Sequence, residues 1–297
     1  MVIKAHIVSH THWDREWYKS FEHFRVRLCF FMDNLIELME KNQNYKSFLF
    51  DAQSVILDDY LELKPQNEER LKKLIKSGRI IVGPWYIQPD EFTPDGEALI
   101  RNLMLGIRTA EKFGRCMKVG YLPDSFGHSA QLPQILKGFG IDNLVAMRGI
   151  PSYKIKSNEF MWKGINGCSI IGIHLKEGYF NACFLPDDYN TADERILPLM
   201  NKLKKRASTE SVLVMNGIDH QWPQPKMPDY MQHLNKIDKN INYIHSNLED
   251  FVFDIRANKD KLPELTGELI TPEDSRTHTS MASTRMYQKK KMAEKKN

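Results

Sequence analysis

Long hydrophobic runs are missing from the 297-residue sequence, which has a mean hydropathy of −0.49. Its wholly apolar stretches are only a few residues long, whereas a membrane-spanning helix needs about 20 apolar residues. We therefore expect no transmembrane segment and no membrane partner. The first residues, MVIKAHIVSHTHWD, turn polar after eight positions. Because this is too soon for the hydrophobic region of a secretory signal, the sequence also predicts no signal peptide.

Cysteine is scarce as well. The four cysteines, Cys29, Cys116, Cys168 and Cys183, form no CxxC pair. Their spacing predicts no disulfide framework, and without a signal peptide the expected location is the reducing cytoplasm. Cys29 lies within an apolar helical pattern, so we expect it in the core.

A strong excess of one charge is missing from most of the chain. Residues 285–297 contain six of the 42 Lys and Arg but only one of the 38 Asp and Glu. The remaining residues carry 36 basic and 37 acidic side chains, a balance of −1. A nucleic-acid-binding protein needs basic residues clustered on its fold. The charge distribution therefore predicts no nucleic-acid partner.

Strand-like and helix-like segments alternate along the chain. Apolar, β-rich segments occur at 3–9, 47–51, 79–83, 117–121, 143–147, 158–163, 169–175, 211–215 and 241–245. Helical patterns occur at 21–41, 53–76, 96–114, 129–139, 190–206 and 228–239. This alternation is typical of a mainly parallel sheet with helices outside, and about seven strand–helix units fit. We predict an α/β fold, a deformed (β/α)7-like barrel with its helices outside.

Polar clusters follow several of the expected strands. HTHWDREW follows the first strand, FDAQ the second, GPWYIQPDEF the third and YLPDSFGHS the fourth, and MNGIDHQWP follows the strand at 211–215. In parallel α/β folds, the loops that leave the carboxyl ends of the strands carry the chemistry. We therefore expect these clusters to converge on one face.

The first cluster, His10-Thr11-His12-Trp13-Asp14, contains two imidazoles and a carboxylate within five residues. In an extended loop the side chains of His12 and Asp14 share a side. The nitrogen of His12 and the oxygen of Asp14 could coordinate one divalent metal ion there. A loop that is simply polar is the alternative, but the HxHxD pattern at a strand end beside two tryptophans favours metal binding.

The second cluster contains Asp124, which follows Pro123 at the end of an expected strand. Two roles are open for this carboxylate, metal ligand and nucleophile. Ser125 or Ser129 could also cap the helix that ends near Phe139. Such a cap is compatible with either role of Asp124.

The third cluster supplies a second carboxylate, Asp219, at the end of another strand. Hydrolysis of a glycosidic bond takes two carboxyl groups, one to attack or assist and one to donate a proton. His220 could donate to sugar or phosphate oxygens, and a purely structural Asp219 is the alternative.

Aromatic residues lie close to these acids in the sequence. They are Trp13, Trp17, Tyr18, Trp85, Tyr86 and Trp222. Each could be a core residue, but several stand inside polar loops, which favours a role as platforms that stack on sugars. Asp90 and Glu91 in QPDEF could orient the site or bind hydroxyl groups.

The motifs HTHWDREWY, GPWYIQPDE, YLPDSFGHSAQLPQIL and NGIDH together resemble the catalytic domain of glycoside hydrolase family 38, the retaining, zinc-dependent α-mannosidases. The resemblance covers nearly the whole chain, and the motifs arrive in the order of the family. It implies one Zn²⁺ per chain, with His12, Asp14 and Asp124 as ligands. It also implies the nucleophile at Asp124 and the general acid/base at Asp219. The implied substrate contacts are Trp17, under the sugar, and Arg148, beside the nucleophile; Trp85 and His220 join them as candidates.

The resemblance also implies a domain division. Residues 1–268 would form the catalytic domain, and residues 269–297 would begin a helical-bundle domain. Family members are far longer, and the family's fourth zinc ligand is a histidine downstream of Asn297. His245 and His278 do not match that motif. We therefore expect residues 1–297 alone to retain zinc weakly and to show little activity, and the longer protein to form a homo-oligomer.

The expected substrate is an α-mannoside, and its leaving group is open. Bacterial members act on mannosylglycerate, sometimes phosphorylated, and on α-mannosides of host glycans. Arg148, Lys163 and Lys176 could meet a carboxylate or phosphate. Two alternatives remain: a metal-dependent polysaccharide deacetylase, which would use an activated water, and a catalytically inactive fragment.

Overall fold

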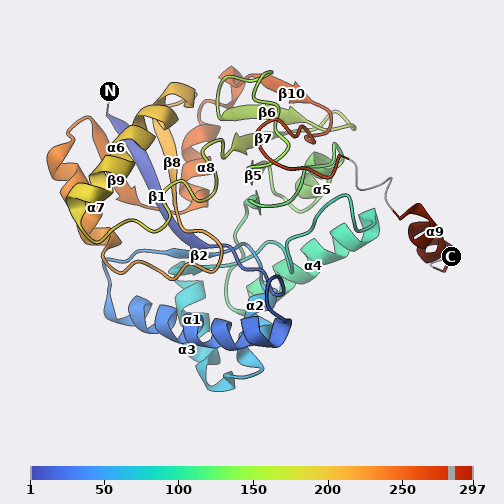
Figure 1. The fold of residues 1–297 in the computed structure, drawn as a ribbon, viewed down its shortest axis with the longest axis horizontal. Coiled ribbons are helices and arrows are strands. Elements are labelled where there is room, and N and C mark those ends of the chain that lie inside the picture. Colours follow the sequence, from blue (N-terminus) through green and yellow to red (C-terminus); the bar gives the residue numbers. More distant parts are fainter. Residues whose placement is uncertain (1, 280–284, 296–297) are drawn as a thin grey trace.

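The computed structural model describes residues 2–279 and 285–295, which form an α/β fold around two five-stranded sheets (Figure 1). The first sheet is wholly parallel. Its order is β3 (Ile80–Ile81), β2 (Phe48–Phe50), β1 (Ile3–Thr11) and β8 (Ser211–Asn216), with β9 (Ile241–His245) also paired to β1. Because β9 and β2 pair with different parts of β1, this long strand organises the sheet.

The second sheet is parallel apart from one pair. Its order is β10 (Glu264–Thr266), β6 (Glu159–Lys163), β7 (Ser169–His174), β5 (Asn143–Ala146) and β4 (Gly120–Leu122). Only β6 and β7 run antiparallel. The predicted α/β fold with mainly parallel strands is confirmed. In the described part of the chain, however, the strands divide between two sheets and do not pair into one closed barrel.

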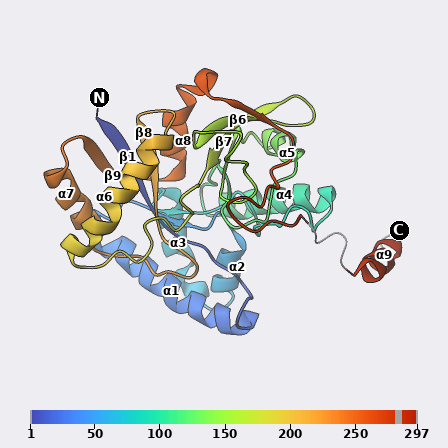
Figure 2. The same ribbon diagram turned by 45° about the horizontal axis from the view of Figure 1, so that its top comes forward.

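Within residues 2–279, eight helices lie around these sheets, as predicted. They are α1 (Phe21–Lys41), α2 (Val55–Leu61), α3 (Glu68–Lys76), α4 (Gly96–Lys112), α5 (Leu132–Gly138), α6 (Tyr189–Arg206), α7 (Met227–Ile237) and α8 (Leu248–Arg256). A further helix among the described residues, α9 (Met286–Glu294), has no buried residue. Helices α6 and α7 pack on β8 and β9, and α1–α3 lie beside β2 and β3 (Figures 1 and 2). No helix in the described part of the chain is long and apolar enough to cross a bilayer.

Two details of the secondary structure differ from the prediction. The helix expected at 53–76 is two helices, α2 and α3, separated by a 3₁₀ turn at Pro65–Asn67. Proline cannot continue a helix, because it lacks a backbone N–H and clashes with the preceding turn. Helix α8 and strand β10 were not predicted. Both are short, and periodicity is a weak signal in short segments.

Helix α1 shows how the pattern of the sequence builds the core. Its predicted stripe is at most 1% exposed; the residues are Phe24, Leu28, Phe31, Leu35 and Met39. Full burial of such a side chain contributes about 1.5–3 kcal/mol, before losses of conformational entropy. Cys29 is buried on the same helix, as predicted. Four residues of the stripe belong to the same hydrophobic cluster as apolar side chains of the first sheet; they are Leu28, Phe31, Leu35 and Met39.

The β1–β8 pair continues beyond the strands into the loops that follow them. The His12 N–H donates to the Ile218 carbonyl over 3.3 Å, and the His220 N–H donates to the His12 carbonyl over 2.8 Å. Gly217 permits this close approach, because a Cβ there would lie 1.9 Å from the His10 carbonyl oxygen. His12 and Asp219 are thereby held side by side as a parallel bridge.

The segment after β10 returns to the α/β body. Leu269 forms a β-bridge with His128, and Thr271 forms one with Gly149. The division at 268/269 and the helical-bundle domain stay predictions. Within the expected second domain, residues 280–284 and 296–297 lie outside the described residues.

Candidate active site

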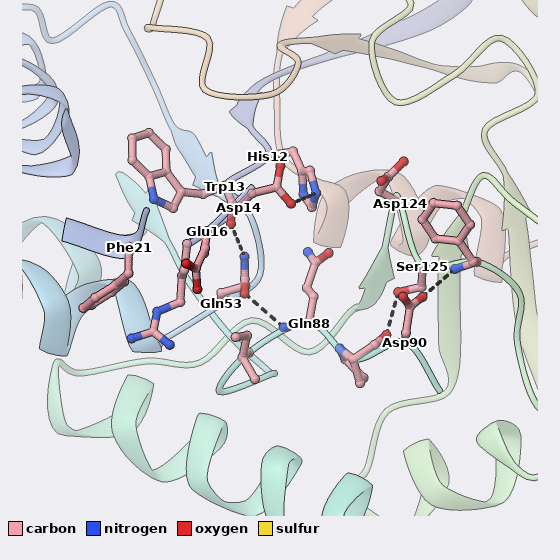
Figure 3. Close-up of a pocket in the computed structure, with 14 residues that line it drawn as sticks. His12, Trp13, Asp14, Glu16, Phe21, Gln53, Gln88, Asp90, Asp124 and Ser125 are labelled. Carbon is pink, nitrogen blue, oxygen red and sulfur yellow. Dashed lines mark hydrogen bonds and ion pairs between the residues drawn. The ribbon is translucent and has the colours of Figure 1, made fainter. Parts of the chain in front are cut away.

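A cavity of about 630 Å³ opens where the loops after β1, β2, β3 and β4 meet. It is lined by His12, Trp13, Asp14, Arg15, Glu16, Phe21, Gln53, Ile87, Gln88, Pro89, Asp90, Asp124, Ser125 and Phe126. Figure 3 shows His12 and Asp14 side by side, with Asp124 and Ser125 toward one end of the cavity and Phe21 toward the other. Several of the polar clusters therefore do converge at one site.

His12 is oriented by a buried carboxylate. Its Nδ1 lies 2.9 Å from Asp51 at the end of β2. Because the Nδ1–H donates to Asp51, Nε2 is the nitrogen that would lose its proton on binding a metal ion, and Nε2 lies 3.7 Å from Asp14 Oδ1. A carboxylate that fixes the tautomer in this way is typical of metal-binding histidines.

Asp51 itself is fully buried and surrounded by donors. The Trp13 N–H and the Gln53 amide each donate to Oδ2 over 2.7 Å, and the Gln88 amide donates to Oδ1 over 3.0 Å. Asp51 has φ 53°, the left-handed region that favours glycine. Such a conformation costs about 1–3 kcal/mol and persists only where its surroundings enforce it. Its four donors, His12 included, supply that enforcement.

Asp14 is positioned through its backbone. Its N–H donates to His220 Nε2 over 3.2 Å, and the Tyr18 hydroxyl lies 3.4 Å from His220 Nδ1. Burial lowers the pKa of His220 to about 4, so the ring is neutral and Nε2 can accept. His220 therefore fixes the backbone of the loop that carries Asp14.

Asp124 is held by Arg148. The Arg148 Nε donates to Asp124 Oδ1 over 3.1 Å, and Nη2 donates to the same oxygen. Among the described residues, Asp124 Oδ2 has no hydrogen-bond donor. One oxygen of this carboxylate is thus fixed by a guanidinium while the other is available to a ligand or substrate.

Asp219 is held by a tyrosine that follows β7. The Tyr179 hydroxyl donates to Asp219 Oδ1 over 2.7 Å, and the Tyr179 ring meets the His12 ring edge-on at 5.6 Å. Tyr179 therefore links Asp219 to the His12 side of the cavity.

The charges at this site favour a cation. Burial lowers the pKa of His12, but the negative charges of Asp51, Asp14 and Asp124 outweigh burial and raise it to about 10. Burial raises the pKa of Asp14 to about 6, with further rises from Asp51, Asp219 and Asp124. Burial also raises the pKa of Asp124, against the opposing effect of His12 and Arg148. Three carboxylates thus surround one imidazole in a partly desolvated space.

The side chains of this site include donors that suit a metal ion. Within residues 2–279 and 285–295, no three His, Cys, Asp or Glu side chains already converge at metal-binding geometry. The chemistry of the donors fits nonetheless: an imidazole nitrogen with its tautomer fixed, the Asp14 carboxylate and the available oxygen of Asp124. Nitrogen and carboxylate oxygen donors are the ligands of catalytic zinc sites.

The chain matches the model of the glycosyl hydrolases family 38 N-terminal domain over residues 2–269. The chain belongs to glycoside hydrolase family 38. It is 36% identical to a protein of Halalkalibacterium halodurans named "Putative mannosylglycerate hydrolase", over 96% of this chain and 34% of that protein. Thus the chain spans about a third of the length of this relative.

Two solved structures are similar to this chain. An α-mannosidase from Enterococcus faecalis V583 is 32% identical with a TM-score of 0.88, over 91% of this chain and 31% of that one. A protein in the glycosyl hydrolase family 38 from Enterococcus faecalis is 27% identical with a TM-score of 0.74, over 90% of this chain and 29% of that one.

The family 38 domain brings most of the predicted site residues together. His12, Asp14 and Asp124 line the cavity, and Asp219 lies beside His12. Arg148, predicted to lie beside the nucleophile, donates hydrogen bonds to Asp124, the residue predicted to be that nucleophile. The individual roles of these residues stay predictions. Trp17 is 63% exposed and lies outside the cavity lining, and its role as a sugar platform also stays a prediction.

Two predicted substrate contacts need correction. Trp85 is fully buried in the hydrophobic core, so its ring cannot stack on a sugar. A tryptophan inside a polar sequence cluster can still point inward, because alternate residues of an extended segment face opposite sides. His220 is 5% exposed, and its Nε2 is engaged by the Asp14 backbone. His220 therefore contacts the loop that carries Asp14, a predicted metal ligand, and does not line the cavity.

The acids of the QPDEF segment have different positions. Glu91 is buried, where it lies 2.6 Å from His128 Nδ1 and accepts from the Ser129 N–H. Asp90 lines the cavity and accepts from the Phe126 N–H over 2.8 Å. Glu91 thus orients the loop after β4, and Asp90 is within reach of a ligand.

Four residues of the site were not predicted from the sequence: Asp51, Gln53, Gln88 and Tyr179. The first three lie in FDAQ and GPWYIQPDEF, polar clusters recognised at strand ends but without assigned roles. Two polar side chains separated by one residue at the second strand end, Asp51 and Gln53, were the available signal. Tyr179 lies in KEGYF, where no pattern marks it.

We expect Asp51→Asn to weaken metal binding by about 10–100-fold, because the substitution removes the charge that orients His12. The NH₂ group that the substitution introduces would also face one of the buried donors that Asp51 accepts from. This donor–donor contact should lower the free energy of unfolding by about 1–3 kcal/mol. Zinc competition with a chromophoric chelator and thermal unfolding would measure both effects. Asp33→Asn is a matched control, because Asp33 accepts from Tyr60, Lys64 and Asn67 away from the cavity. Equal zinc affinity in both variants would contradict the role of Asp51.

Proposed function

We propose that the protein hydrolyses terminal α-mannosides with retention of configuration, in a zinc-dependent reaction. The observation that carries this proposal is the arrangement of Asp124 and Asp219 around His12 and Asp14 in a family 38 domain. Two carboxylates at different strand ends can serve as nucleophile and acid/base. The metal would be held by His12, Asp14 and Asp124. When bound, zinc supplies Lewis-acid stabilisation and orients the sugar hydroxyls.

Asp124 is the proposed nucleophile. The Asp124 carboxylate would attack the anomeric carbon through one oxygen and form a mannosyl ester, while the Arg148 guanidinium keeps the group oriented. Arg148 also lessens the rise of the Asp124 pKa that burial causes, which favours the ionised, nucleophilic form.

Asp219 is the proposed general acid/base. It would protonate the leaving oxygen in the first step and take a proton from water in the second. The Tyr179 hydroxyl donates to Asp219 Oδ1, so Oδ2 is the oxygen that would carry the transferred proton. A separation of about 5–5.5 Å between the two carboxyl groups in a substrate complex would suit retention.

The proposed substrate class includes mannosylglycerate and its phosphate, in keeping with the name of the Halalkalibacterium halodurans relative. Of the basic residues expected to meet an acidic group, Lys176 pairs with Asp274 and Arg148 pairs with Asp124. Arg15 is a cation of the cavity wall itself, held by Asp59 through Nε and Nη2. Its remaining nitrogen could donate to an acidic leaving group.

A trapping experiment tests the proposal. A 5-fluoro mannosyl fluoride should inactivate the enzyme and leave a sugar ester on the peptide that contains Asp124, identified by mass spectrometry. Hydrolysis of a panel of aryl mannosides, mannosylglycerate and its phosphate would then identify the leaving group. Turnover without any trapped ester, or an ester on another residue, would count against Asp124.

The two alternatives give different results in the same experiments. A polysaccharide deacetylase would release acetate and form no ester with the fluorinated sugar. An inactive fragment would give neither product, and longer versions of the protein would restore turnover. The order of the motifs favours the mannosidase.

We further propose that the two sheets are the halves of a deformed (β/α)7-like barrel.

A further inference from the structure

The segment 269–278, called the strap below, crosses the loops that follow β4 and β5. Leu269 and His128 exchange backbone hydrogen bonds of 2.7 and 2.9 Å, and the Thr271 N–H donates to the Gly149 carbonyl over 3.0 Å. Asp274 accepts from the Ser152 hydroxyl over 2.5 Å and pairs with Lys176. The strap is therefore anchored to the body of the domain well before its last residue.

The last residue of the strap, His278, packs against the loop that carries Asp124. Its N–H donates to the Phe126 carbonyl over 2.9 Å. Its ring stacks on the Phe126 ring with centroids 4.9 Å apart and planes 16° apart. The side chain is only 11% exposed. His278 thus contacts both the backbone and the ring of a cavity residue.

His278 also lies beside Asp90. Its Nε2 is 3.0 Å from Asp90 Oδ2, an ion-pair distance without hydrogen-bond geometry, while the other oxygen of Asp90 accepts from the Phe126 N–H over 2.8 Å. His278, Phe126 and Asp90 therefore form a closed triangle of contacts. Two of its members, Phe126 and Asp90, line the cavity.

This triangle reaches Asp124 through one more contact. The Arg148 guanidinium carbon lies 4.4 Å from the centre of the Phe126 ring, and Arg148 is the residue that holds Asp124. A shift of the Phe126 ring would remove the surface against which the guanidinium packs.

We propose that His278 is a positioning residue of the active site, which fixes the Phe126–Asp90 wall of the cavity for the bound sugar. The inference rests on the proposed function, because it assumes that a mannoside occupies this cavity. His278 does not touch the reacting atoms. It acts by keeping two wall residues in one arrangement.

The test compares three variants at this position with a matched control. His278→Ala removes both contacts, His278→Phe keeps the stacking on Phe126, and His278→Gln keeps a polar group beside Asp90. The control is His233→Ala, because His233 also pairs with a carboxylate, Asp193, at 2.8 Å and stacks on a tyrosine. His233 lies on α7, away from the cavity lining.

Two measurements are made on each variant. Hydrogen exchange of the Phe126 amide should accelerate about tenfold in His278→Ala, because Asp90 loses its second partner. For aryl α-mannoside hydrolysis, KM should rise about tenfold while kcat changes less than about threefold. His278→Phe and His278→Gln should each recover part of both effects, and His233→Ala should change neither.

The outcomes separate the two proposals. Unchanged exchange at Phe126 in His278→Ala, or the same KM as in His233→Ala, would overturn the positioning role. If the unsubstituted protein neither binds nor hydrolyses any α-mannoside, the proposed function fails. The exchange measurement alone then decides whether His278 holds the wall.

Discussion

Replacing Asp124 by asparagine is expected to abolish hydrolysis of α-mannosides in the active protein while leaving its fold in place. The amide has nearly the same shape as the carboxylate but cannot attack the anomeric carbon. Removal of a nucleophile of this kind lowers kcat by about 10⁴-fold or more. Steady-state turnover of an aryl α-mannoside, with circular dichroism to verify folding, would measure the effect.

A matched control separates loss of chemistry from loss of an ion pair. Asp142 is hydrogen-bonded to Arg256 through both of its oxygens, over 2.7 and 3.2 Å, much as Asp124 is engaged by Arg148. Asp142→Asn should therefore keep normal turnover. If Asp124→Asn keeps more than about 3% of the normal kcat, Asp124 is not the nucleophile.

Asp219→Ala is expected to slow substrates with poor leaving groups by about 10²–10⁴-fold, because these need a proton on the departing oxygen. Activated aryl mannosides need little protonation and should be slowed much less at the step that forms the ester. Azide should partly restore their turnover, because it attacks the mannosyl ester without help from a base. A series of aryl mannosides with leaving groups of increasing pKa would measure this dependence.

The control for this variant is Asp193→Ala. Asp193 accepts from the Tyr230 hydroxyl over 2.9 Å, as Asp219 does from Tyr179, but it lies on α6 beside α7. Its replacement should not make the rate depend on the leaving group. Equal losses with good and poor leaving groups in Asp219→Ala, without azide rescue, would remove Asp219 from the acid/base role.

Much of the fold could be predicted because hydrophobic periodicity reports burial directly. The α1 stripe is one example, since its five expected core residues are all buried. The division of the strands into two sheets could not be predicted in this way. Strand order depends on pairing between distant segments, and periodicity in one segment carries no information about its partner.

The site shows the same contrast at the level of single residues. His12, Asp14 and Asp124 could be predicted because each belongs to a dense polar cluster at a strand end. Asp51 could not, since its role depends on reaching His12 from another strand. Trp85 was misjudged for a related reason: the sequence shows that it neighbours polar residues but not that its ring faces the core.

The hydrogen-bonded register of β1 and β8 has a consequence for how this family can change. His12 and Asp219 lie on loops that continue that register, so their relative position is set by strand pairing. One extra residue between Asn216 and Asp219 would advance Asp219 by about 3.3 Å and turn its side chain to the opposite face. The length of the segment between Asn216 and Asp219 therefore cannot change by one residue without moving Asp219 out of the site. The loop after β3 does not belong to that strand pair, so the cavity positions of Ile87 and Pro89 are free of this constraint.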